Sequence, residues 1–344
     1  MHANIAGFAA AGDYPDAFRK DALLSNPDNF RFYATIHIPL IRAIAKISGS
    51  YATAFSSLII PTVFLHLSGF YTLGRTVLKS RYWSVLLAAS TLVPVNLKIL
   101  GLFWGIYPDV LPRIAFQAFL PFLLSLAYFW REKTNFWPWL MVLSGSLVYI
   151  HPVSAPGWAF AIWLGLWFFM PHRYLWKNKV SYMAILGAIC VATVLPFAVH
   201  YIANYAYGDV DNYEQIYEIM RNRFIDGYLE IPNTIKRYFF VITFEIYLFI
   251  PSILALITVL KLNGNRKRKE VILLAVWGFG ILLFSMLIPL LDHSYAQATE
   301  SIPIQINLIR GASYFVPLML MSCLWALVEL SSKTAAYRRH IEPI

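Results

Sequence analysis

Long apolar runs recur through this chain, and they decide what it can fold into. Each run extends over about 17 to 26 residues, enough for a helix to cross roughly 30 Å of hydrocarbon. Only 13% of the residues are charged and 59% are hydrophobic, whereas soluble domains carry about 25% charged residues. We therefore expect an all-α polytopic membrane protein whose one transmembrane domain, residues 53–331, has about nine transmembrane helices. The expected spans are 53–75, 83–103, 112–130, 136–151, 155–171, 180–203, 238–260, 271–291 and 305–330.

Basic residues gather in alternate connections between these spans. Sixteen of the 28 Lys and Arg residues, but only four of the 18 acidic residues, lie at 75–81, 131–133, 173–179, 261–270 and 329–344. Because cytoplasmic loops are enriched in Lys and Arg, the basic tail, residues 332–344, is predicted to be cytoplasmic and the N-terminus outside. We expect a bacterial inner membrane, and this distribution of charge argues against a nucleic-acid partner.

Two segments outside the membrane have the pattern of interfacial helices. In residues 1–52, Leu40, Ile41, Ile44 and Ile47 recur at helical spacing, with basic residues on the other face. In the long outer loop, residues 204–237, an acidic and basic face opposes Tyr213, Ile216, Tyr217, Met220 and Phe224. Ordinary loop packing is the alternative for both. Because the N-terminal segment lies outside with no span to carry it there, we also expect a further span upstream.

The segment from Gly12 to Asp21 concentrates charged residues ahead of the first span. Asp13 and Asp16 could act as a general base for an acceptor hydroxyl, or hold a divalent metal such as Mg²⁺ or Mn²⁺. Arg19 and Lys20 could bind the phosphate of a lipid-linked donor. A solvated turn is the alternative, since Asp, Pro and Gly are common turn formers.

Two tight outer turns carry further polar residues. Asp109 lies between Pro108 and Pro112, which fix its backbone, and near Asp13 or Asp16 it would complete a pair of acids. His151, in the turn between the fourth and fifth expected spans, could donate to phosphate or ligate a metal. A bland turn at Asp109 and a structural His at 151 are the alternatives.

Charged residues within the apolar runs are candidates for function because charge is expensive there. Glu245 and Arg310 lie at similar expected depths, so they could pair; alternatively Arg310 binds a phosphate or pyrophosphate. Lys98 is expected to extend to the headgroups. Cys190 and Cys323 lie in apolar runs and are expected to behave as buried hydrophobes, without a disulfide.

This pattern resembles the GT-C class of polytopic glycosyltransferases, which use sugars linked to polyprenyl phosphate. The likeness rests on the acidic outer segment from Gly12 to Asp16, the interfacial helix after it, the Asp109 and His151 turns and the long outer loop. It implies a lipid-linked sugar donor, with Asp13 or Asp16 as base or metal ligand. Arg19, Lys20, Asp109, His151 and Arg310 would bind substrate. The first span of that class and a soluble C-terminal domain have no counterpart in this sequence.

Two other functions remain open. A transporter or flippase predicts buried polar groups near the middle of the membrane and matching broken helices. A glycan polymerase or ligase on the outer face predicts that Arg221, Arg223 and Arg310 contact pyrophosphate. A lipid-linked sugar transferase predicts instead that the acids, His151 and Arg310 converge on one outer cavity.

Overall fold

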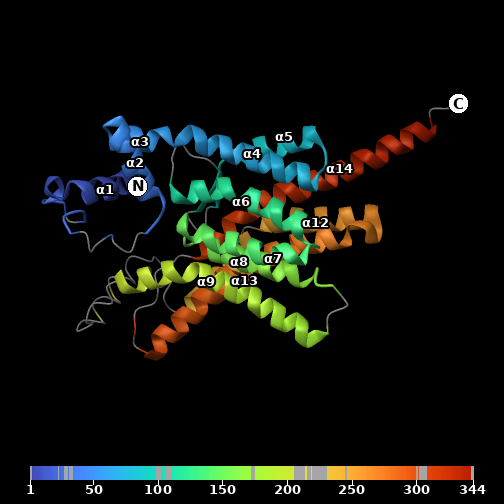
Figure 1. Ribbon diagram of the computed structural model, residues 1–344. Helices are drawn as coiled ribbons and strands as arrows, with labels where there is room; N and C mark the ends of the chain where they lie inside the picture. The colour runs from blue at the N-terminus through green and yellow to red at the C-terminus, as the bar shows by residue number, and fades with distance from the viewer. Residues whose placement is uncertain are drawn as a thin grey trace.

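The computed structural model shows a helical protein with one short β-hairpin (Figure 1). It describes residues 2–21, 23–26, 30, 34–97, 102–105, 111–171, 175–204, 214, 218, 231–244, 246–299, 301 and 308–341. Helices α1–α3 gather at one end of the molecule, and α14 extends beyond the other helices at the opposite end. The expected interfacial helix in residues 213–224 lies almost wholly outside the described residues.

Three short helices form a compact unit at the N-terminal end. They are α1 (His2–Asp13), α2 (His37–Ser48) and α3 (Tyr51–Ser57), with the 3₁₀ turn η1 (Pro15–Phe18) after α1. Gly49 adopts a left-handed φ of 72° and ends α2, and the Ser50 hydroxyl then accepts a hydrogen bond from the Thr53 N–H and caps α3. The amphipathic helix expected in residues 36–51 is therefore confirmed as α2.

The apolar interior of this unit differs from the predicted face of α2. Ile41 and Ala45 are buried against Ile5 and Ala9 of α1, whereas Ile47 is 89% exposed. The sequence pattern did not predict α1, whose alanines and isoleucine supply the other half of this contact. The acidic segment is therefore not a plain turn, because Asp13 is the last residue of α1.

Among the described residues, the most extensive contact between two helices joins α4 (Ile59–Val77) and α6 (Pro112–Trp130). The two helices run side by side through Gly69, where an added Cβ would lie 2.6 Å from Pro121 Cγ. This close approach at a small residue is typical of helices that pack within a membrane. The helix expected at 112–130 is confirmed as α6, which is long and apolar enough to cross a membrane, and the span expected at 53–75 corresponds to α3 and α4.

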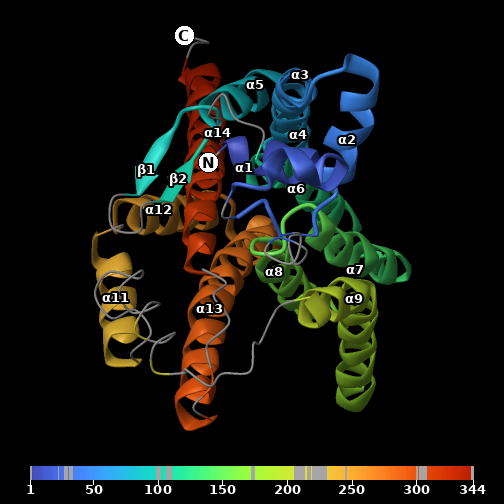
Figure 2. The ribbon, with the colours of Figure 1, turned by 90° about the vertical axis from the view of Figure 1, so that its left-hand side faces the viewer.

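The expected span at 83–103 is wrong as a single helix. Helix α5 (Arg81–Ser90) ends early, and a hairpin of β1 (Val95–Leu97) and β2 (Leu102–Trp104) follows, with Val95 paired to Trp104. Pro94 has no N–H to continue the helix. The Trp104 indole donates to the Thr91 carbonyl at 3.1 Å and so satisfies a group that the helix end leaves free. The hairpin lies at the edge of the bundle (Figure 2), where β2 contacts η6.

The middle of the chain forms two short helices and one long one. Helix α7 (Trp137–Ser146), with the turns η3 (Thr134–Phe136) and η4 (Leu147–Tyr149), and helix α8 (Ala155–Trp167) have 10 and 13 residues. At about 1.5 Å per residue, neither helix alone reaches across about 30 Å of hydrocarbon. Helix α9 (Trp176–Asn204) has 29 residues and is long enough.

The last described part of the chain contains four more helices. These are α11 (Ile231–Phe244), α12 (Ile246–Asn263), α13 (Arg268–Thr299) and α14 (Phe315–Ile341), with the 3₁₀ turns η5 (Gly264–Lys267) and η6 (Leu308–Tyr314). Among the described residues, five stretches are long and apolar enough to cross a membrane: 51–77, 112–130, 176–204, 246–299 and 315–334. The fourth stretch holds both α12 and α13, which are separate helices in Figure 2. The nine expected crossings are not confirmed.

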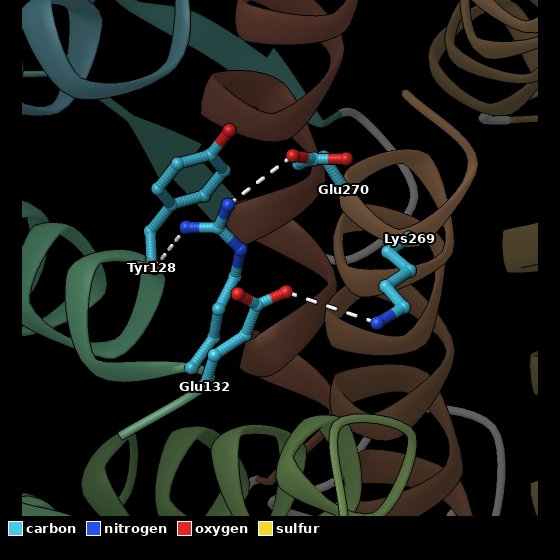
Figure 3. Close-up of polar contacts among 5 residues, drawn as sticks. Tyr128, Glu132, Lys269 and Glu270 are labelled. Atoms are coloured by element: carbon cyan, nitrogen blue, oxygen red, sulfur yellow. Dashed lines mark hydrogen bonds and ion pairs between the residues drawn. The ribbon is translucent and has the colours of Figure 1, made fainter. Parts of the chain in front are cut away.

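Ion pairs fix two basic connections beside each other (Figure 3). Arg131, after α6, bonds Glu270 in the first turn of α13 at 3.2 Å, and Lys269 approaches Glu132 at 3.8 Å. Both connections therefore lie at the same end of the bundle, as the alternation of basic loops predicts. Cys190 and Cys323 are free cysteines, and both are half-buried rather than fully buried.

Candidate functional site

Asp13 is held by two partners from the N-terminal unit. Arg42 Nη2 of α2 donates to Asp13 Oδ1, and the Tyr51 hydroxyl of α3 donates to Oδ2 at 2.5 Å. The hydrogen bond from Arg42 is the main cause that lowers the pKa of Asp13 below its ordinary value. The same bond raises the pKa of Arg42. Asp13 is thus an ionised carboxylate whose two oxygens both accept hydrogen bonds.

The neighbouring predicted residues lie in a different environment. Asp16 and Arg19 form an exposed ion pair at 2.9 Å within η1 and the residue after it, and Lys20 is exposed. Asp21 accepts hydrogen bonds from the backbone N–H groups of Leu24 and Leu23, and these bonds lower the pKa of Asp21. Among the described residues, no group of three or more His, Cys, Asp or Glu side chains could hold a metal ion. The divalent metal stays a prediction.

A cavity of about 640 Å³ opens beside the Asp13 and Arg42 pair. The backbone N–H of Ile36 donates to the Tyr149 carbonyl at 2.8 Å, and this bond docks the segment before α2 onto the turn between α7 and α8. Arg42 from α2 and His200 from the end of α9 supply the ionisable side chains of the wall. The lining residues are Phe8, Gly12, Phe30, Ala34, Thr35, Ile36, Ile38, Pro39, Arg42, Tyr149 and His200.

A second, apolar hollow of about 450 Å³ lies between α7, α8 and α9. Its lining includes Val148, which precedes Tyr149 of the first cavity in the chain. It also includes Ala198, two residues before His200 of the first cavity. This apolar groove comes close to the cavity that contains Arg42 at η4, where Val148 and Tyr149 are adjacent in the chain, although the two share no lining residue among the described residues. Its lining residues are Met141, Ser144, Gly145, Val148, Ala155, Pro156, Ala159, Phe160, Trp163, Gly187, Cys190, Val191, Val194, Leu195 and Ala198.

His151 belongs to a third region, an aromatic cluster centred on Tyr314. The His151 Nδ1 lies 2.9 Å from the Ser154 hydroxyl, and its ring is 6.2 Å from the ring of Phe116. Phe116, Trp104 and Trp158 each place a ring 5.7–5.8 Å from Tyr314 in edge-to-face orientation. His151 and η6, which carries Arg310, therefore meet across Phe116 and Tyr314.

Several buried polar atoms near this cluster have no hydrogen-bond partner among the described residues. They are Tyr314 Oη, Trp158 Nε1, Arg113 Nε, both amide atoms of Gln117, and His66 Nδ1. The Thr91 hydroxyl donates to the Ala88 carbonyl, so in the contact with Thr91 it is His66 Nε2 that donates. His66 Nδ1 is then an acceptor without a donor.

Sequence reasoning missed Arg113, Gln117 and Tyr314. The available signal was the spacing of Arg113 and Gln117, four residues apart on one face of an otherwise apolar helix. Asp109, Glu245 and Lys98 lie outside the described residues, as does the side chain of Arg310. Leu111 packs against the apolar interior of the α1–α3 unit, so the start of α6 lies beside that unit.

The predicted residues that the structure describes lie in three places: Asp13 is paired with Arg42, Asp16, Arg19 and Lys20 are exposed, and His151 belongs to the aromatic cluster. Comparisons with models of protein families, with curated proteins and with solved structures gave no match.

Proposed function

We propose that this protein is a membrane glycosyltransferase that moves a sugar from a polyprenyl-phosphate donor to an acceptor on the non-cytoplasmic face. In this proposal the chain crosses the membrane about nine times, with the N-terminus outside and the C-terminus in the cytoplasm. One observation carries the proposal: an apolar groove between α7, α8 and α9 comes close, at Val148 and Tyr149, to a cavity lined by Arg42 and His200.

The paired cavities match the chemistry of a lipid phosphate. A polyprenyl chain is apolar and would lie in the groove between α7, α8 and α9, away from water. Its phosphate would lie in the adjoining cavity, where the Arg42 guanidinium offers donors in a fixed fork. His200, at the end of α9, is the second ionisable group of that wall.

In this proposal Asp13 positions Arg42 rather than acting as the base. Its carboxylate accepts from Arg42 and Tyr51, and its lowered pKa makes it a poor proton acceptor. Asp16 is exposed and stays a predicted base, as does Asp109. A base would take the proton of the acceptor hydroxyl as the sugar leaves the phosphate.

The test compares two matched pairs in a sugar-transfer assay with a polyprenyl-phosphate-sugar donor. Arg42→Gln should lower transfer about tenfold or more, because a charged hydrogen-bond donor to phosphate is lost. Arg19→Gln, which breaks an exposed Arg–Asp pair in the same unit, should change transfer less than about twofold. Equal effects of the two substitutions would contradict the proposal.

The acidic partners complete the comparison. Asp13→Asn should lower kcat without raising KM for the donor, because Arg42 keeps its charge but loses the group that orients it. Asp16→Asn tests the base directly: a large loss with normal activity in Arg19→Gln would identify Asp16 as the base.

A flippase is the second candidate function. The buried amide of Gln117 and the Nδ1 of His66, which have no hydrogen-bond partner among the described residues, support it, since transporters place polar groups inside the membrane. A fluorescent lipid phosphate reconstituted in vesicles would cross the bilayer in that case without any sugar transfer. The residues informative for a polymerase or ligase, Arg221 and Arg223, lie outside the described residues.

A further inference from the structure

The start of α6 presents hydrogen-bond donors that the cavity beside Arg42 does not use. We propose that Arg113, Tyr314 and Trp158 form a second anion site, which binds a phosphoryl group. This inference does not rest on the proposed transferase function, because neither the donors nor the charge belong to the cavity of Arg42.

Arg113 supplies the positive charge. It is half-buried, its Nε lies out of contact with solvent, and that atom has no hydrogen-bond partner in the described part of the chain. No acidic side chain among the described residues forms an ion pair with Arg113. A buried guanidinium without a counter-ion is costly, and a bound anion would remove that cost.

Tyr314 and Trp158 supply the neutral donors. Their side chains are 2% and 1% exposed, and the Tyr314 hydroxyl and the Trp158 indole N–H have no partner among the described residues. The two rings pack edge to face at 5.8 Å, so both donors are held in place. The Tyr314 hydroxyl interacts electrostatically with Arg113 and lies close to Ser154, outside hydrogen-bonding geometry.

The balance of groups selects an anion over other ligands. The guanidinium Nε–H and the indole N–H can only donate, and the tyrosine hydroxyl can donate as well. Two neutral donors on rings in contact, together with the charged Nε–H of Arg113, would suit the several acceptor oxygens of a phosphoryl group. The positive end of the α6 dipole, at Pro112, adds to the same preference. Because Arg113 is only half-buried, an anion can reach it from solvent.

Thermal unfolding of the full chain in detergent tests the site. Inorganic phosphate should raise the unfolding temperature above that in chloride of equal ionic strength, because a ligand that binds only the folded state stabilises it. Tyr314→Phe should weaken the apparent phosphate affinity about tenfold, the usual effect of losing a hydrogen bond to a charged group. Arg113→Gln should abolish the response.

Two control variants separate this site from other effects. Tyr128→Phe changes another buried tyrosine and should leave the phosphate response intact. Arg42→Gln should also leave it intact, even if sugar transfer fails, so the two proposals can fail separately. Tyr314→Phe conserves shape, so it keeps the test informative if Arg113→Gln does not fold.

The source of the phosphoryl group follows from a parallel experiment in nanodiscs of phosphatidylcholine with or without phosphatidate. Stabilisation by phosphatidate alone would support the site and assign it to a lipid headgroup, whereas stabilisation by inorganic phosphate alone would support the site and assign it to a free phosphate ester. The inference would be overturned if the unaltered protein responded to neither probe. It would also be overturned if Tyr314→Phe and Arg113→Gln responded as strongly as the unaltered protein.

Discussion

Replacing Glu270 by glutamine should destabilise this protein far more than the same change at Glu132, four residues beyond Tyr128 on the partner connection (Figure 3). Both glutamates pair with a basic residue across the same two connections, and both substitutions remove one negative charge. The two pairs differ in burial. Arg131 and Glu270 have side chains 21% and 15% exposed, whereas Lys269 and Glu132 are 65% and 60% exposed.

The magnitude follows from distance and burial. At 3.2 Å and an effective dielectric constant of about 20, the attraction of Arg131 for Glu270 is about 5 kcal/mol before desolvation. Arg131 is further fixed by a 2.6 Å hydrogen bond to the Tyr128 carbonyl and by the Tyr128 ring at 4.3 Å. Glu270→Gln leaves this charge partly buried and unpaired, so it should lower the free energy of unfolding by about 2–3 kcal/mol. Glu132→Gln should lower it by less than about 1 kcal/mol.

The measurement is reversible unfolding in mixed micelles, with a double-mutant cycle for each pair. The cycle for Arg131 and Glu270 should give a coupling free energy above about 1 kcal/mol, and the cycle for Lys269 and Glu132 one near zero. Added salt should weaken only the exposed pair. Equal losses for Glu270→Gln and Glu132→Gln would refute the reasoning, because they would mean that Arg131 is solvated and the two connections do not pack together.

Three further substitutions test the packing, the ionisation and the buried polar groups. Gly69→Ala should lower the free energy of unfolding by about 1–3 kcal/mol, because the added Cβ would lie 2.6 Å from Pro121 Cγ. Gly187→Ala should not lower it, because the nearest atom to the added Cβ is 3.7 Å away. Chemical denaturation of the two variants measures the difference. Burial lowers the pKa of His37 from 6.5 to about 4, so the unfolded chain takes up a proton first as the pH falls. Stability should therefore be complete above pH 6.5 and decrease from there to about pH 4, and His37→Leu should flatten that part of the pH profile of the unfolding temperature. Gln117→Leu should raise the free energy of unfolding of the unliganded protein by about 1–3 kcal/mol by removing an unpartnered amide, and a fall would show that Gln117 has a partner.

Periodicity and the length of the apolar runs predicted the helices whose limits are set by their own sequence. The span at 112–130 coincides with α6 because Pro112 begins the helix and Arg131 follows its end. Helix α2 was also predictable, since its apolar and basic residues alternate at helical spacing. Its buried face was not predictable, because that depends on α1, which is short and mostly alanine and glycine between its polar ends.

The prediction of a single helix at 83–103 was wrong because tertiary contacts stabilise a hairpin in part of this range. Hydropathy is similar for a helix and for an apolar hairpin, and Pro94 gave the only local sign of a break. Trp104 of the hairpin contacts Thr91, which lies shortly before β1, and also His66 and Tyr314, which come from distant parts of the chain. The contacts within the candidate site could not be predicted for the same reason: the sequence singles out Asp13 and His151, but Arg42 and Phe116, which contact them, lie far away along the chain.

The two arginines at this end of the molecule differ in one respect that decides what each can bind. Arg42 already has a carboxylate partner, Asp13, which offsets most of the positive charge of the guanidinium. Arg42 therefore contributes to ligand binding mainly through the fixed orientation of its hydrogen-bond donors. Arg113 has no acidic partner among the described residues, so its charge remains available. A phosphoryl group gains more from an unpaired guanidinium than from a paired one, since the pair must first lose part of its own attraction. In these proposals the site at Arg113 binds a phosphoryl group alone, whether it is free or part of a lipid headgroup, whereas the ligand at Arg42 also places an apolar chain in the groove between α7, α8 and α9.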